Sequence, residues 1–447
     1  MFLTSEAFGA LNGKAHLPDW NTTTVLMISY EWDVIRGGPE ALAGLRLAAR
    51  LRESGARVHA LTAIGAEQSG GADRVAVVRA KPYARTRLGR AWQMIRSGVP
   101  EPQGMWVRNA VQRGRRVLSS LPGNTVIYSR AMPGSSNIVA WHLARSTGLP
   151  WVAHFSDEWP AVQLVSNGRL LLAPYKAPLF HVWRRRIFTD AGALTFTNPR
   201  QARAVLGSMT ERFLSKAFVV THLPTDSHRR SRPQQSELFH IVHTGNLNPP
   251  GHSSEALIRG LRLFLDRVPQ ARNKVRLTQA GWSNGDLPGW TRRCGLDDVV
   301  RVVGRLTGPE LIELMDNASL LVGFDYSRPD SATLLSKLPD YVNSRRPILV
   351  ITAPTSAMGH LFREDGVGLT AHYDSPEEVA EQVSRVFDAW QRGEFQAFLP
   401  TATAIESFTD RSVLAELAAA FSVARTATRA INQDSHRLAL LGHESSR

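Results

Sequence analysis

The stretch TTVLMISYEWDVIRGGPEALAGLRLAARLRESGARVHALTA, residues 23–63, decides the fold class. It begins with an apolar run typical of a buried strand, passes through a loop with two glycines, and continues with leucines at roughly helical spacing. Pro39 suits the first turn of this helix and Gly55 suits its C-terminal cap, ahead of a second apolar run. Strand, loop, helix and strand in this order predict a βαβ unit with parallel strands, and so an α/β sheet.

The same alternation recurs along the chain and restarts once. Strands are predicted at 124–130, 149–157, 192–198 and 218–224, and then at 238–245, 274–281, 299–304 and 319–325. Between the two groups, residues 225–237 are polar and basic, which is typical of an interdomain linker. We therefore expect two Rossmann-like domains, at 1–224 and 238–405, followed by an amphipathic helix at 406–426 and a polar tail at 427–447.

The net charge of +14 raises the question of an anionic binding partner. Nucleic acid, an anionic membrane and phosphorylated small molecules are the partners that such a charge suits, and a basic surface in water is the plain alternative. No basic helix, zinc finger or aromatic nucleic-acid motif occurs, so we expect no nucleic acid. Cys294 is the only cysteine, which excludes an intramolecular disulfide and a zinc site built from cysteines.

No signal-peptide pattern and no apolar run long enough to span a bilayer is found, so we expect a cytoplasmic protein, soluble or peripheral at the inner face of the plasma membrane. Two segments, residues 81–116 and 169–188, interleave arginine with tryptophan and leucine. That composition suits a helix in the interface of an anionic membrane. It suits equally an ordinary helix whose apolar side packs on the core while its arginines face water.

Open parallel sheets bind ligands at the carboxyl ends of their strands, so the loops there are the places to search. The first such loop contains Arg36, Gly37 and Gly38 directly before a helix, where an anion or an acceptor group is favoured. In the second half, three strand-end loops could grip a nucleotide through backbone groups. Their candidate residues are Gly245, Asn246, Gly281 and Arg305.

The segment TLLSKLPDYVNSRRPILV, residues 333–350, places Ser336, Lys337 and Asp340 close together ahead of a strand. Pro339 fits the first turn of a helix that begins near Lys337. Lys337 and Asp340 are three residues apart and lie on one face, where they could hold a diphosphate and a ribose. A surface ion pair of small energetic effect explains the same spacing.

Four stretches together resemble the family 4 glycosyltransferases of the GT-B fold. They are YEWDVIRGGPEALAGLRLAARLRESGARVHALTA, IVHTGNLNPPGHSSEALIRGL, VVGRLTGPELIELMDNASLLVGF and SKLPDYVNSRRPILVITAPTSAMGHLFREDGVGLTA. The resemblance covers most of the chain in order and implies two Rossmann-like domains with a cleft between them and a C-terminal helix that returns to the N-terminal domain. It also implies transfer of a sugar, with retained configuration, from a nucleotide-sugar donor to a lipid-linked or polysaccharide acceptor.

The family pattern carries over to several residues of the donor segment. Lys337 matches the lysine that faces phosphate, and Asp340 matches the acid that binds ribose, usually a glutamate. Ala332 stands where the family has a second, sugar-facing acid. An Arg and a Lys that often follow the domain-two glycine are missing, so Arg346 is expected to supply charge, with Arg345 and Arg36 as alternatives.

In the first half, AHFSDEWP, residues 153–160, resembles the loop that faces the acceptor in this family. His154 or Asp157 could orient or deprotonate an acceptor hydroxyl, and Trp159 could stack on a sugar. No D-x-D motif is present, so neither a metal nor another cofactor is expected, and Lys337, Arg346 and the Gly245 backbone would neutralise the diphosphate. A non-catalytic binding subunit and a nucleotide-sugar epimerase of the same fold are the alternatives.

Overall fold

The computed structural model describes residues 19–33, 38–66, 70–80, 84, 86–101, 103–159, 165–166, 169–170, 176–225, 237–247, 254–281, 287–306 and 308–444. The expected linker, 225–237, lies outside this part of the chain except at its two end residues. The chain divides into two compact units. Among the described residues, the C-terminal unit contains Leu223–Thr409, and the N-terminal unit contains those from Asp19 to His222 together with those from Asp410 onward.

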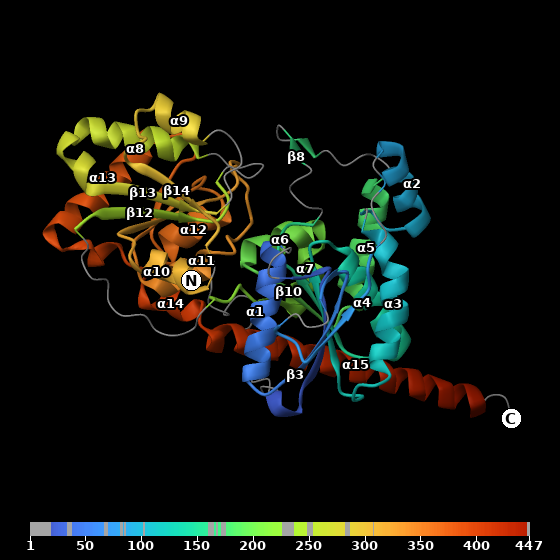
Figure 1. The fold of residues 1–447 in the computed structure, drawn as a ribbon. Helices are drawn as coiled ribbons and strands as arrows, with labels where there is room; N and C mark the ends of the chain where they lie inside the picture. Colours follow the sequence, from blue (N-terminus) through green and yellow to red (C-terminus); the bar gives the residue numbers. More distant parts are fainter. Residues whose placement is uncertain are drawn as a thin grey trace. The chain divides into compact units, whose positions relative to one another are not determined.

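The N-terminal unit is built on a parallel sheet of seven strands in the order β11-β10-β7-β6-β1-β3-β5 (Figure 1). The predicted βαβ unit at its centre is confirmed, because β1 pairs with β3 in parallel and Pro39 opens the helix between them. The strands are β1 (Thr24–Ile28), β3 (Arg57–Thr62), β5 (Arg74–Val77), β6 (Val126–Ala131), β7 (Trp151–Phe155), β10 (Ala193–Phe196) and β11 (Ala217–Val219). Two short strand pairs accompany the sheet, β2 (Glu31–Trp32) with β4 (Ile64–Gly65), and β8 (Val165–Ser166) with β9 (Arg169–Leu170).

Helices follow the strands of this sheet and bury its faces. Alternate residues of β7 separate the faces: Trp151, Ala153 and Phe155 join a large apolar cluster with Trp106 and Phe188. The helices are α1 (Pro39–Glu53), α2 (Arg87–Ser97), α3 (Gly104–Leu118), α4 (Ser135–Thr147), α5 (Lys176–Asp190), α6 (Pro199–Leu206) and α7 (Thr210–Phe213), with short 3-10 turns η1 (Trp20–Thr22), η3 (Gly207–Met209) and η4 (Leu214–Lys216).

The long C-terminal helix α15 (Asp410–Glu444) packs on β7, β10 and β11 of the N-terminal sheet. Phe421 contacts the rings of Trp20 and Tyr128, each with ring centroids 5.9 Å apart. Gly192 lies so close to the helix that a Cβ on it would meet the Ala424 Cα at 2.7 Å. The helix therefore belongs to the N-terminal unit, and it continues past residue 426, where the sequence suggested a polar tail, because residues 427–441 contain neither proline nor glycine.

The C-terminal unit contains a parallel sheet of six strands in the order β14-β13-β12-β15-β16-β17 (Figure 1). These strands are β12 (Phe239–Thr244), β13 (Val275–Ala280), β14 (Val300–Gly304), β15 (Leu320–Phe324), β16 (Ile348–Ile351) and β17 (Leu369–Ala371). The helices are α8 (Glu255–Arg267), α9 (Leu287–Arg293), α10 (Gly308–Asp316), α11 (Leu338–Ser344), α12 (Ala357–Glu364), α13 (Pro376–Arg392) and α14 (Ala402–Ser407), with η5 (Pro269–Lys274) and η6 (Phe395–Phe398). The expected helix that begins near Lys337 is confirmed as α11, with Lys337 as its N-cap residue.

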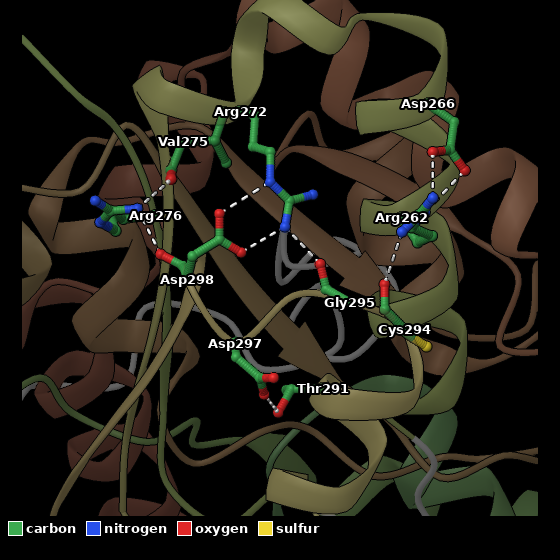
Figure 2. Close-up of polar contacts among 10 residues, drawn as sticks. All are labelled: Arg262, Asp266, Arg272, Val275, Arg276, Thr291, Cys294, Gly295, Asp297 and Asp298. Atoms are coloured by element: carbon green, nitrogen blue, oxygen red, sulfur yellow. Dashed lines mark hydrogen bonds and ion pairs between the residues drawn. The ribbon is translucent and has the colours of Figure 1, made fainter.

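Arginines hold the amino-terminal edge of this sheet together, as Figure 2 shows. The Arg272 guanidinium donates to both oxygens of Asp298, at 2.9 and 2.5 Å, and Arg276 donates to the Asp298 carbonyl at 2.7 Å. Arg262 donates to the Cys294 carbonyl at 3.1 Å. These cations serve the fold and leave the carboxyl edge as the place for ligands.

Candidate functional site

Three predicted glycine loops meet at the carboxyl edge of the C-terminal sheet, because β12, β13 and β14 are neighbours there. The Gly245 amide donates to the Ala280 carbonyl at 2.6 Å, and the Gly281 amide donates to the Gly304 carbonyl at 2.7 Å. The loops therefore form one hydrogen-bonded row. The hydrogen of the Gly245 amide already has an acceptor inside the protein, and the expected approach of a diphosphate to the Gly245 backbone stays a prediction.

The glycines of this row allow neighbouring backbone and the Lys337 side chain to approach closely. Gly281 has φ +148°, and a Cβ on it would lie 2.1 Å from the Gly245 carbonyl oxygen. Gly245 has φ +100°, and a Cβ there would lie 2.8 Å from the Lys337 Nζ. A side chain at Gly281 is therefore excluded by backbone, whereas one at Gly245 would be strained by its φ and would have to displace the Lys337 ammonium. The lysine thus lies directly against the loop after β12.

Lys337 brings a positive charge to this row. Its Nζ donates to the Thr244 carbonyl oxygen, the last residue of β12. Burial lowers the pKa of the Lys337 ammonium from 10.5 to about 7. An anion at this place would stabilise the charged form, so the lysine is suited to bind a phosphate group.

Two further side chains of α11 fix Lys337 in place. The Tyr341 hydroxyl accepts from the Thr244 amide at 2.9 Å and donates to the Val322 carbonyl at 3.2 Å, so it ties α11 to β12 and β15. The Asp340 Oδ1 accepts from the Thr225 amide at 2.6 Å, and Asp340 is buried. Asp340 thus anchors the chain where it enters this unit, and its expected contact with a ribose stays a prediction.

Asp325, which the sequence analysis missed, organises the loop that leads to Lys337. It follows β15 directly, and its carboxylate accepts from the Ser331 hydroxyl at 2.8 Å, the Thr352 hydroxyl at 2.9 Å and the Tyr326 amide at 2.7 Å. Burial raises the pKa of Asp325 to about 6, against the effect of these hydrogen bonds. Its signal in the sequence is an acid that ends a buried apolar strand.

The remaining donor candidates fall at different places. Arg305 is exposed and follows β14 at the same edge, Asn246 is exposed next to Gly245, and Ser336 directly precedes Lys337. Arg346 does not join them. The seven residues of α11 span about 10 Å and carry Arg346 to the opposite, amino-terminal edge of the sheet, ahead of β16. There it is buried and feels the charge of Asp316, so its assignment to the donor site is wrong.

Ala332 is buried in the loop held by Asp325, with 4% of its surface exposed. Its neighbour Asp330 is exposed and pairs with Arg328 at 3.3 Å. The position of the missing family acid is therefore closed by an apolar side chain.

In the N-terminal unit, Asp157 lies just past β7, at the carboxyl edge of the sheet, and is partly buried. Burial, together with the neighbouring charges of Glu40 and Glu158, raises its pKa to about 7. A carboxyl group with this pKa can accept a proton near neutral pH, as a general base requires.

His154 and Trp159 do not reach an acceptor. His154 is buried within β7, where its Nδ1 lies 3.0 Å from the Thr195 hydroxyl, and burial holds its pKa well below the usual range. Trp159 is only 2% exposed, packs on Phe180 at 5.2 Å, and donates from its Nε1 to Glu101 at 2.8 Å. A sugar cannot stack on a ring enclosed by the core, so both assignments are corrected.

A buried ion pair near Asp157 was also missed. The Arg130 Nε donates to Glu40 at 2.7 Å, and both side chains are largely buried. Glu40 lies in the first turn of α1, and Gly38 is the N-cap residue of that helix. The Gly38 amide donates to the Glu31 carboxylate at 2.8 Å, so a carboxylate of the protein already occupies the start of α1. Arg36 and Gly37 lie outside the described residues.

The described residues contain no cluster of three or more His, Cys, Asp or Glu side chains suited to a metal ion. Nor does this part of the chain contain a helix with the length and apolar character needed to cross a bilayer.

Comparison with known proteins gives one family match. The model of the family described as "Glycosyl transferase 4-like domain" matches residues 37–212. No curated protein sequence matches the chain.

Solved structures share the fold at low sequence identity. HepE from Anabaena, solved with UDP and glucose, is 14% identical with a TM-score of 0.56, over 92% of this chain and 99% of HepE. Sucrose-phosphate synthase from Thermosynechococcus elongatus is 13% identical with a TM-score of 0.59, over 92% and 100% of the two chains. WaaG, a glycosyltransferase involved in lipopolysaccharide biosynthesis, is 15% identical with a TM-score of 0.60, over 89% and 98%.

Proposed function

We propose that the protein transfers a sugar from a nucleotide-sugar donor, because residues 37–212 match the model of the glycosyl transferase 4-like domain family and solved structures that include a glycosyltransferase share the fold. The observation that carries the proposal is the ammonium of Lys337 set against the glycine loop after β12. A diphosphate is the group that such a charge, fixed beside backbone without side chains, would bind.

The proposed chemistry needs neither metal nor cofactor. The bond between the anomeric carbon and the diphosphate oxygen breaks, and the acceptor hydroxyl oxygen forms the new bond to that carbon. Lys337 stabilises the negative charge that develops on the leaving diphosphate, since a fixed cation in a poorly hydrated site acts without reorganisation. We propose that the configuration is retained and that the Asp157 carboxylate takes the proton of the acceptor hydroxyl, with help from the departing phosphate.

Donor and acceptor classes are proposals supported by the fold relatives. HepE was solved with UDP and with UDP-glucose, so we propose a UDP-sugar donor. WaaG takes part in lipopolysaccharide biosynthesis, and we propose a lipid-linked or polysaccharide acceptor. The protein would then work in the cytoplasm, at the inner face of the plasma membrane.

Thermal unfolding with nucleotides tests the proposal. A ligand at about 100 times its Kd stabilises the folded state by about 2.7 kcal/mol, so UDP should raise the midpoint of unfolding by several degrees. Lys337→Ala should remove this shift and Asp340→Ala should reduce it. Lys274→Ala is the control, because this exposed lysine lies at the opposite edge of the same sheet. A shift that is equal in wild type and Lys337→Ala would exclude the proposed site.

A non-catalytic binding subunit is the second candidate, and the buried Ala332 favours it. Such a protein would show the UDP shift and the effect of Lys337→Ala but would release no UDP from a panel of UDP-sugars and acceptors. An epimerase would instead interconvert two nucleotide sugars without an acceptor, which NMR of the donor pool detects.

A further inference from the structure

Helix α2 exposes an apolar face that no other described part of the molecule matches. Leu88 is 85% exposed, Ile95 70% and Trp92 59%, whereas the next most exposed large apolar side chain, Val302, is at 44%. The three residues are spaced four and three apart, so they lie on one face of the helix. Large apolar groups gathered in this way mark an interaction surface.

The helix is held firmly on the N-terminal unit. Met94, on another side of α2, is buried, and α2 packs against α3. The Trp183 Nε1 of α5 donates to the carbonyl of Gly98, the C-cap residue of α2, at 2.7 Å. The apolar face is therefore presented by a packed element.

The other basic aromatic elements do not share this exposure. In α3, Trp106, Val107 and Ala110 are buried, and in α5 Phe180, Trp183 and Ile187 are buried. Apart from Arg184, which donates to the carbonyls of Val205 and Leu206, their arginines are exposed while their apolar side chains build the core. This is the ordinary alternative left open by the sequence. Among the described residues of the two segments, only those of α2 keep the features of an interfacial helix.

The stretch of sequence that contains α2 is strongly basic. Between residues 74 and 156 the chain has thirteen Lys and Arg residues, whereas its only acid there is Glu101. The Glu101 carboxylate is occupied at the start of α4 by the amides of Gly134 and Ser135. On α2 itself, Arg90 and Arg96 are exposed, and the Arg96 guanidinium lies 5.1 Å from the Trp92 ring centroid. Most of the excess charge of the chain therefore lies in the segment that carries the apolar face.

We propose that the Leu88–Trp92–Ile95 face of α2 docks the protein on an anionic lipid bilayer. Leucine and isoleucine enter the acyl boundary, tryptophan lies at the headgroup level, and the arginines pair with anionic headgroups. A nucleic acid would bind the arginines but offers no apolar phase for Leu88 and Ile95. Three side chains are also too small a surface for a stable dimer, which buries about 1,200 Å² or more.

Vesicle co-sedimentation of the full chain tests the proposal without using glycosyl transfer. The probes are phosphatidylcholine vesicles with phosphatidylglycerol and vesicles of phosphatidylcholine alone. Wild type should partition to the anionic vesicles, and Leu88→Ser/Trp92→Ser/Ile95→Ser should lower the partition coefficient by at least about tenfold. Arg90→Glu/Arg96→Glu should lower it on anionic vesicles by about as much.

Matched controls are available on the C-terminal unit. Val302→Ser removes an exposed apolar side chain from β14, and Arg385→Glu/Arg392→Glu makes the same charge change on the exposed side of α13. Both should partition as wild type does, and all variants should unfold at the wild-type temperature because the changed residues are exposed.

The proposal is overturned when wild type stays in solution with anionic vesicles, or when the triple serine variant partitions as well as wild type. If wild type ignores vesicles and the triple change abolishes self-association seen by light scattering, or binding of RNA or DNA, the face serves that partner instead.

Discussion

Lys337 donates a hydrogen bond from its ammonium to the backbone carbonyl of Thr244, which joins the start of α11 to the end of β12. A carbonyl is a neutral partner and leaves the charge of the lysine uncompensated. The site is therefore built around a cation whose burial is unfavourable until an anion binds.

We expect Lys337→Met to abolish the thermal shift caused by UDP and to raise the unfolding temperature of the free protein by a few degrees. The pKa of Lys337 is about 7 in the folded protein and 10.5 when unperturbed, so the unfolded state binds more protons between these values. The increase in unfolding temperature of the free Lys337→Met protein over wild type should be largest at pH 7 and below and vanish near pH 10.5. Calorimetry as a function of pH measures it, and Lys274→Met should show no such gain.

We expect activity to rise as the pH increases through about 7, the pKa of Asp157, because only its carboxylate form accepts a proton. Asp157→Asn should lower kcat by about 100-fold or more and remove this limb of the profile. The raised pKa also means that the folded state loses stability as the pH rises from 3.8 to about 7, and the variant should lose less. An unchanged pH profile in Asp157→Asn would assign the base elsewhere.

Glu40→Gln should destabilise the N-terminal unit by about 3 kcal/mol, because it leaves the Arg130 guanidinium buried without its carboxylate. The exposed pair of Arg52 and Asp73, at 2.8 Å, is the control, and Arg52→Gln should cost less than about 1 kcal/mol. Glu40→Gln should also move the activity limb to lower pH, since the charge of Glu40 raises the pKa of Asp157. Urea unfolding and the pH profile measure the two effects.

Gly281→Ala should destabilise the C-terminal unit by about 3 kcal/mol and weaken UDP binding, because its Cβ would displace the Gly245 carbonyl. Gly304→Ala is the matched control in the same row. It also has a positive φ, +75°, but its Cβ would meet nothing within 4 Å, so it should cost only about 1 kcal/mol. Equal losses in the two variants would mean that backbone conformation, and not close approach, decides the effect.

The sequence was sufficient for the features that depend on local pattern. The alternation of strands and helices predicted both parallel sheets, and the strand-end rule together with the family resemblance led to Gly245, Gly281 and Lys337. The family resemblance is supported over residues 37–212 by the domain match, and the expected fold is shared by the solved structures.

The predictions that failed concern residues whose position depends on where a short helix or strand ends and on which of its faces is buried. Arg346 was assigned to the donor site because it is near Lys337 in sequence, yet α11 carries it across the sheet. Trp159 follows a strand, as an acceptor residue would, but Glu101 and Phe180, remote in sequence, enclose its ring. The ion pair of Glu40 and Arg130 joins α1 to β6 across 90 residues of sequence. No local sequence pattern predicts such a pair.

The return of α15 to the N-terminal sheet fixes the order in which the chain can fold during translation. The strands β7, β10 and β11 and the ring of Tyr128 remain uncovered on one face until residues 410–424 have left the ribosome. Among the described residues, the C-terminal unit is the single stretch Leu223–Thr409, which is synthesised before that point. The half of the protein that is made first is therefore the half that finishes folding last, and it must stay free of aggregation while the other half is synthesised.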